Sequence, residues 1–177
     1  MNHFSKTALK YLSQRLFTEE TQIFIVPDGI KTTKNLPGNI LLANRNLVED
    51  FEDPDVLAGY LIVEKLRSET YNPIEELLQN ISLISTFRLL TTGLINDDTL
   101  MDYADYLVTK PEEIVQSSEI IKAFNDTNLS LLPFAKAIDI TGEGSLELIE
   151  AFEIRNSPVE TSLPDANWVS LQNICNS

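Results

Sequence analysis

Residues 53–67 read DPDVLAGYLIVEKLR, and the surrounding chain is organised around them. Their apolar side chains recur at spacings of three and four, which is typical of a helix with a broad buried face. Asp53 or Asp55 can cap the N-terminus of such a helix, and Pro54 suits its first position. The stretch therefore predicts a helix over 54–67 that lies against the core.

The composition is that of one globular domain of 177 residues with a strongly acidic balance. Lys and Arg number 13 against 27 Asp and Glu, which gives a formal net charge of −14 at pH 7. Because nucleic acids and anionic membranes are bound by clusters of Lys and Arg, this balance argues against both as partners. The sequence has no apolar run of membrane-spanning length and no signal-peptide pattern, so we expect a cytoplasmic protein.

The chain contains one histidine, His3. Zinc sites built from several imidazoles are impossible within one chain, because they need more than one histidine. A catalytic triad would have to use a residue at a terminus, where chains are poorly ordered. Histidine-based catalysis is therefore set aside, and we predict no metal site and no cofactor.

Two short β-rich runs precede the central helix, at 22–26 and 40–43. The intervening residues are a Pro27-Asp28-Gly29 turn, a polar stretch over 32–35 and a Leu36-Pro37-Gly38-Asn39 turn. Because no crossover helix separates the two runs, we expect them to be antiparallel neighbours.

The rest of the chain has the pattern of helices joined by short turns. We expect helices over 4–17, 74–91, 99–109, 112–125, 145–152 and 166–175, a helical turn over 47–51, and either a short helix or an extended segment over 129–140. The sequence thus predicts an α+β, mostly helical domain. A small antiparallel N-terminal sheet packs on the central helix, and a helical C-terminal part follows.

The order of these pieces resembles that of the gluzincin zinc metallopeptidases, the family of the heat-shock and prenyl-protein endopeptidases. The 36–39 turn matches the family's Leu-Pro-Gly-Gly turn, and Arg45-Asn46-Leu47-Val48 matches a short segment after its second strand. Residues 56–67 match, without a gap, the helix that carries His-Glu-x-x-His. Met101-Asp102-Tyr103-Ala104-Asp105 is similar to a later Glu-x-x-Ala-Asp segment.

The resemblance covers about residues 20–110 and implies a single zincin-like domain over 1–177, with 111–177 as a helical extension. It places Val63 and Arg67 at the two histidine positions, Met101 at the third ligand position and Glu64 at the position of the catalytic base. Zinc lowers the pKa of bound water from 15.7 to about 7, so its loss costs roughly 11 kcal/mol in forming hydroxide. The resemblance therefore implies a degenerate member without the family's activity.

Two interpretations of the charged turn around Glu64 stay open. In the first, the guanidinium of Arg67 replaces the metal by pairing with Glu64, three residues away, and with Asp105. In the second, Glu64, Lys65 and Arg67 are the solvated face of an amphipathic helix.

Three functions also stay open. The first is an inactive metallopeptidase-like module that binds a peptide or protein. In the family, the strand next to the active-site helix holds the substrate as an added strand, a role that falls here on Ile40, Leu41, Leu42 and Ala43. The second is an active hydrolase with a metal held by carboxylates alone, and the third is a structural helical protein that can form a homodimer.

Overall fold

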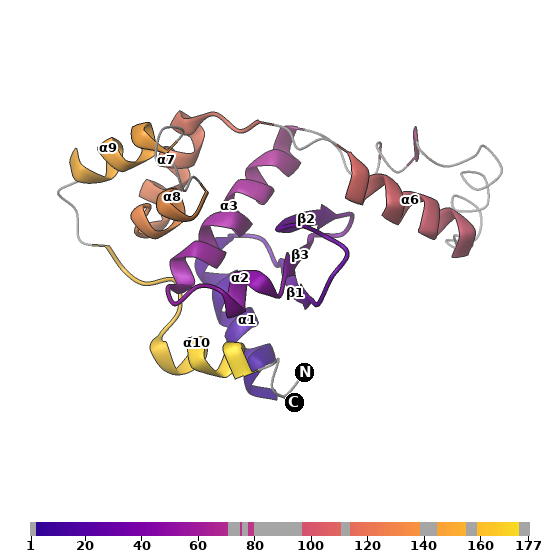
Figure 1. The fold of residues 1–177 in the computed structure, drawn as a ribbon, viewed down its shortest axis with the longest axis horizontal. Coiled ribbons are helices and arrows are strands. Elements are labelled where there is room, and N and C mark those ends of the chain that lie inside the picture. The colour runs from indigo at the N-terminus through magenta and orange to yellow at the C-terminus, as the bar shows by residue number, and fades with distance from the viewer. Residues whose placement is uncertain are drawn as a thin grey trace.

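The computed structural model describes residues 3–70, 75, 78–79, 97–110, 114–138, 145–154 and 159–173. The strands are β1 (Gln22–Val26), β2 (Thr33–Leu36) and β3 (Ile40–Asn44). The helices are α1 (His3–Leu16), α2 (Asn46–Glu49), α3 (Pro54–Thr70), α6 (Asp97–Thr109), α7 (Ser117–Thr127), α8 (Leu132–Ile138), α9 (Leu146–Ile154) and α10 (Asp165–Gln172). The fold is α+β and mostly helical, as the sequence predicts (Figure 1).

The three strands form one mixed sheet in the order β1-β3-β2. β3 pairs in parallel with β1, from Gln22 opposite Ile40 to Val26 opposite Asn44. β3 also pairs antiparallel with β2, from Leu36 opposite Ile40 onward. The prediction that 22–26 and 40–43 are antiparallel neighbours is therefore wrong.

The reason is β2, which reads TKNL and lacks the apolar alternation that marks a strand. The chain reverses once between β1 and β2 and again in the hairpin before β3, so β3 regains the direction of β1. Gly38 and Asn39 have φ angles of 89° and 57° in this hairpin, which is the left-handed region that Gly and Asn tolerate best. The turn predicted over 36–39 is confirmed.

α3 runs through the middle of the molecule, between the sheet and the helices of the C-terminal part (Figure 1). Leu57, Ala58 and Leu61 on this helix are fully buried. α7 and α8 pack against α3, and α9 packs on α7 and α8. α1 and α10 lie side by side, and the Ser5 hydroxyl donates to the Ser170 carbonyl at 3.2 Å.

Both aspartates expected at the start of α3 are used, in different ways. The Asp53 carboxylate accepts a hydrogen bond from the Asp55 N–H at 2.9 Å, which is the capping contact. The Asp55 carboxylate is buried and accepts from the Ser162 N–H at 2.8 Å. The first turn of α3 is thereby tied to the segment that leads into α10.

Gly59 lets α8 approach α3 closely. A Cβ placed on Gly59 would lie 2.3 Å from Cγ of Phe134, which is far inside van der Waals contact. The Phe134 ring meets Tyr60 edge-on at 5.3 Å between centroids and stacks on Phe124 at 5.7 Å. This aromatic cluster joins α3, α7 and α8.

Most predicted helices that fall within the described residues are found within about three residues of their expected ends. α7 is an exception, because it begins at Ser117 and not at 112. The Glu119 carboxylate accepts a hydrogen bond from the Gln116 N–H at 3.3 Å, and this contact caps the N-terminus of α7. Ile114 therefore lies before the helix and is 96% exposed. The ambiguous 129–140 segment contains α8, and most of the helix predicted over 74–91 lies outside the described residues.

Candidate functional site

Glu64, the expected remnant of a catalytic base, is a buried contact between α3 and β2. Glu64 is only 3% exposed to solvent. Oε1 accepts a hydrogen bond from the Asn35 N–H at 2.8 Å, and Oε2 pairs with Nη1 of Arg67 at 3.2 Å. Both carboxylate oxygens are thus engaged by the protein itself.

Burial raises the pKa of Glu64 above its ordinary value, because a charged carboxylate loses hydration in the core. The Asn35 N–H, the Arg67 guanidinium and the Lys34 ammonium oppose this rise without cancelling it. Lys34 is itself buried on β2. The interpretation of Glu64, Lys65 and Arg67 as a solvated helix face is wrong, because Glu64 is enclosed.

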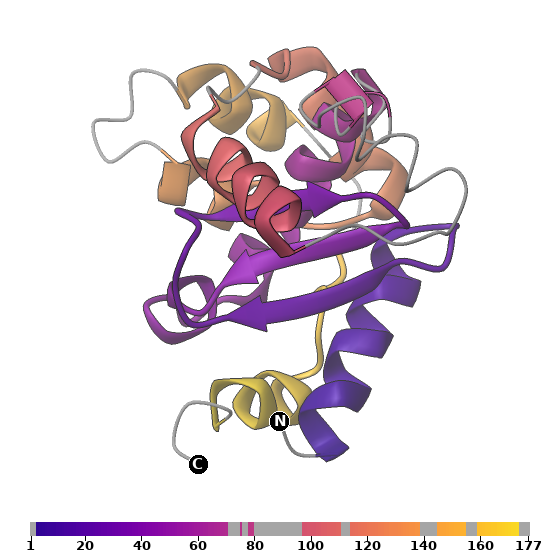
Figure 2. The same ribbon diagram turned by 90° about the vertical axis from the view of Figure 1, so that its right-hand side faces the viewer.

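The other residues of the resemblance do not gather around Glu64. Val63 is buried in the hydrophobic core. Met101 is 67% exposed on α6, and Asp105 is exposed on the same helix and makes no ion pair with Arg67. α6 lies on the other side of the sheet from α3 (Figures 1 and 2), which separates the two helices. The structure brings together Glu64 and Arg67 but not Asp105.

Metal ligands do not converge in the part of the chain that the structure describes. No three or more side chains of His, Cys, Asp or Glu are grouped there so as to hold an ion.

β3 cannot accept an added strand as expected for Ile40, Leu41, Leu42 and Ala43. It is the central strand, and both of its edges are paired, one with β1 and one with β2. Strand addition needs a row of unpaired N–H and C=O groups, which only an edge strand offers. This expectation is corrected: the residues are held inside the sheet.

The outer edge of β2 is closed by α3. The Asn35 N–H that points away from β3 is bound by Glu64. The Thr33 hydroxyl donates to the Tyr60 carbonyl at 3.4 Å, and Thr33 is fully buried. A second strand therefore has no access to this edge.

β1 forms the other edge of the sheet. The Gln22 N–H donates to the Asn39 carbonyl, and the Val26 carbonyl accepts from the Arg45 N–H, each at 2.9 Å. In a parallel ladder, alternate residues direct both backbone groups to the same neighbour. Gln22, Phe24 and Val26 therefore face β3.

The backbone groups of Ile23 and Ile25 consequently point away from the sheet. No hydrogen bond to their N–H or C=O groups is found within the described residues. Their side chains lie on the face of the sheet that the core covers, so the strand is anchored while its outer edge stays open. This edge offers two donors and two acceptors in the alternation that a further strand needs.

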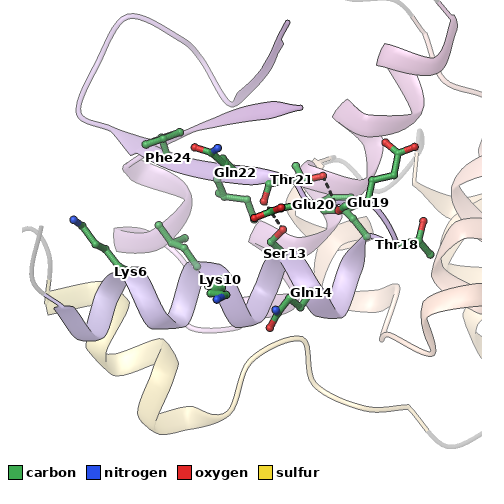
Figure 3. Close-up of a pocket in the computed structure, with 13 residues that line it drawn as sticks. Lys6, Lys10, Ser13, Gln14, Thr18, Glu19, Glu20, Thr21, Gln22 and Phe24 are labelled. Atoms are coloured by element: carbon green, nitrogen blue, oxygen red, sulfur yellow. Dashed lines mark hydrogen bonds between the residues drawn. The ribbon is translucent and has the colours of Figure 1, made fainter. Parts of the chain in front are cut away.

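A groove of about 740 Å³ lies between α1 and the first part of this open edge, as far as Phe24. The lining from β1 is Gln22, Ile23 and Phe24, whose side chains come from both faces of the strand, so the groove borders the strand edge over these residues. Phe24 is 41% exposed. Figure 3 shows Lys6 and Lys10 on the α1 wall, and Glu19 and Glu20 at the end where α1 passes into β1.

The turn from α1 into β1 is fixed by a buried hydrogen bond, in which the Ser13 hydroxyl donates to the Thr21 carbonyl (Figure 3). This contact sets the distance between the helix and the strand at one end of the groove. Sequence reasoning missed the groove because an open edge depends on strand order. The available signal was the Lys6–Lys10 pair, one turn apart on a helix predicted over 4–17.

No helix in the described segments combines the length and the apolar character that crossing a bilayer requires. Comparison with protein-family models, with curated proteins and with solved structures finds no match to this chain.

Proposed function

We propose that this chain is a catalytically inactive, metallopeptidase-like module that binds an extended segment of a peptide or protein by strand addition to β1. The open backbone groups of Ile23 and Ile25 carry the proposal, because such groups are a ready template for another strand. The neighbouring groove gives the added strand a wall on α1. A cytoplasmic location, expected from the sequence, is part of the same proposal.

The inactive character is supported by the surroundings of Glu64. A general base needs a free carboxylate within hydrogen-bond reach of a water or substrate proton. The two oxygens of Glu64 are held by Asn35 and Arg67, and the residue is buried. We infer that the family's frame, with a hairpin packed on the central helix, serves here to support the sheet.

The proposal is tested with ten-residue peptides of alternating valine and threonine, flanked by solubilising residues. Each peptide is made in two further forms, N-methylated at odd or at even positions. In a strand bound at one edge, only alternate N–H groups face the protein. One methylated form should lose binding and the other should keep it, with amide shifts in ¹⁵N-labelled protein centred on Ile23 and Ile25.

A matched pair of variants tests the protein side. Ile25→Pro deletes one outward N–H without removing a ladder hydrogen bond, whereas Ile25→Ala trims the side chain and keeps the N–H. We expect the proline variant to bind less tightly than the alanine variant. Equal binding by both methylated peptides, or no binding by any peptide, would contradict strand addition at β1.

A further inference from the structure

The α1 wall of the groove carries two lysines without a counter-charge. Lys6 and Lys10 are exposed, and neither makes an ion pair or a hydrogen bond in the described part of the chain. Both line the groove, on the stretch of α1 that faces Phe24 and Gln22 (Figure 3). In a chain of net charge −14, a pair of unneutralised cations beside an open strand edge is a distinct local feature.

The spacing of the two lysines fits that of a strand. Four residues of α-helix advance about 6 Å along the helix axis. Two residues of a strand advance about 6.6 Å, and alternate side chains point to the same side. An added strand along β1 can therefore present two side chains at alternate positions to Lys6 and Lys10, one to each.

The opposite end of the groove has the reverse charge. Glu19 and Glu20 stand where α1 turns into β1 (Figure 3). Nζ of Lys65 lies 3.6 Å from Oε2 of Glu19. Glu20 has no ion pair among the described residues. Further carboxylates on the ligand are thus disfavoured at this end, which limits the acidic positions to those beside the lysines.

We infer that the groove selects an extended peptide with two carboxylate side chains at alternate positions, of the form acid-x-acid. This inference rests on the proposed strand addition and adds the chemistry of the ligand. A second copy of the chain is a poorer occupant. β1 reads QIFIV and offers no carboxylate to the lysines, and two chains of charge −14 repel each other.

The test compares two isomeric ten-residue peptides, one with the core Glu-Val-Glu and one with Glu-Glu-Val. They share composition and charge, but only the first directs both carboxylates to one side of a strand. The wild-type protein should prefer the first peptide, measured by fluorescence anisotropy at low salt, and the preference should fade as salt screens it.

The protein variants are Lys6→Glu/Lys10→Glu and a control of equal charge change, Lys122→Glu/Lys136→Glu. The control lysines are exposed on α7 and α8 and do not line the groove. We expect the groove variant to bind the Glu-Val-Glu peptide about tenfold more weakly (~1.4 kcal/mol) and the control to bind as the wild type does. A Lys-Val-Lys peptide should instead gain affinity for the groove variant.

The outcomes distinguish failure of the acid-x-acid inference from failure of strand addition itself. Binding that keeps its dependence on N-methylation parity but ignores Lys6 and Lys10 overturns the acid-x-acid inference and leaves strand addition standing. No binding by any peptide overturns both. Competition by a single-stranded oligonucleotide at the same lysines, or sedimentation as a dimer that dissociates on Ile25→Pro, would assign the groove to another partner and overturn the inference. Circular dichroism and the thermal midpoint verify that each variant folds.

Discussion

Replacing Glu64 by alanine should destabilise the protein strongly, because this carboxylate joins the central helix to the edge of the sheet. The substitution leaves the buried Asn35 N–H without an acceptor, which costs about 1–3 kcal/mol. It also removes the ion pair between Glu64 and Arg67, and breaking a buried ion pair costs about 3–5 kcal/mol. The Arg67 side chain is 19% exposed and can reach water, so we expect a total near 3 kcal/mol.

Glu64→Gln should be much milder. The glutamine oxygen can still accept from the Asn35 N–H, and a neutral side chain avoids the burial cost that raises the pKa of Glu64. A carboxyl group whose pKa is raised on folding holds its proton more tightly in the folded state. Its contribution to stability is greatest below the unfolded pKa of 4.5 and is lost as the pH rises through the folded value.

The assay is urea unfolding of the wild type and both variants at several pH values between 4 and 8, followed by circular dichroism. Since the other carboxylates are common to both proteins, the wild-type minus Glu64→Gln difference isolates Glu64. We expect that difference to shift in favour of the glutamine variant as the pH rises. An alanine variant within about 0.5 kcal/mol of wild type would refute the bridging role, since substitutions without such a role usually stay in that range. A glutamine variant as unstable as the alanine variant would refute burial as the dominant effect.

Further predictions concern the packing, the second buried carboxylate and the metal. Gly59→Ala should destabilise the protein by about 1–3 kcal/mol despite the better helix propensity of alanine, because the added methyl group overlaps the Phe134 ring. Urea unfolding measures this change, and an unchanged unfolding midpoint would contradict the prediction. Asp55→Ala should cost about 1–3 kcal/mol by orphaning the Ser162 N–H, and Asp55→Asn should cost less in the same assay. Purified, dialysed protein should carry far less than one equivalent of zinc by elemental analysis, whereas one tightly held equivalent would favour the carboxylate-metal hydrolase.

Local signals sufficed for the helices but not for the sheet. The caps and apolar spacing of α3 lie within a few residues of one another, so its position follows from sequence alone. β2 carries no such signal, because its polar residues Thr33, Lys34 and Asn35 are buried by contacts from distant parts of the chain. Missing β2 also reversed the expected direction of β3, since strand direction depends on the number of chain reversals.

The candidate site shows the same division between local and distant contacts. Glu64 and Arg67 are about one helical turn apart, so the sequence alone suggests their pairing as one of two interpretations. The Asn35 N–H that holds the other carboxylate oxygen comes from a strand that the sequence did not indicate. The open edge of β1 was likewise hidden, because it exists only through the order β1-β3-β2.

The two edges of this small sheet differ in whether another element covers them, and this difference bears on function. An exposed strand edge is an aggregation hazard, which proteins commonly remove with covering elements or with charged residues on the edge strand. The β2 edge is covered in this way by α3 through Glu64. β1 has no charged residue, and none of the residues that the structure describes forms a hydrogen bond with the outward backbone groups of Ile23 or Ile25. The nearby lysines belong to α1, on the far wall of the groove. Lysines that served only to protect the strand edge from aggregation would not need a groove of about 740 Å³ between α1 and β1. A bound peptide would fill this groove and contact both the helix and the strand.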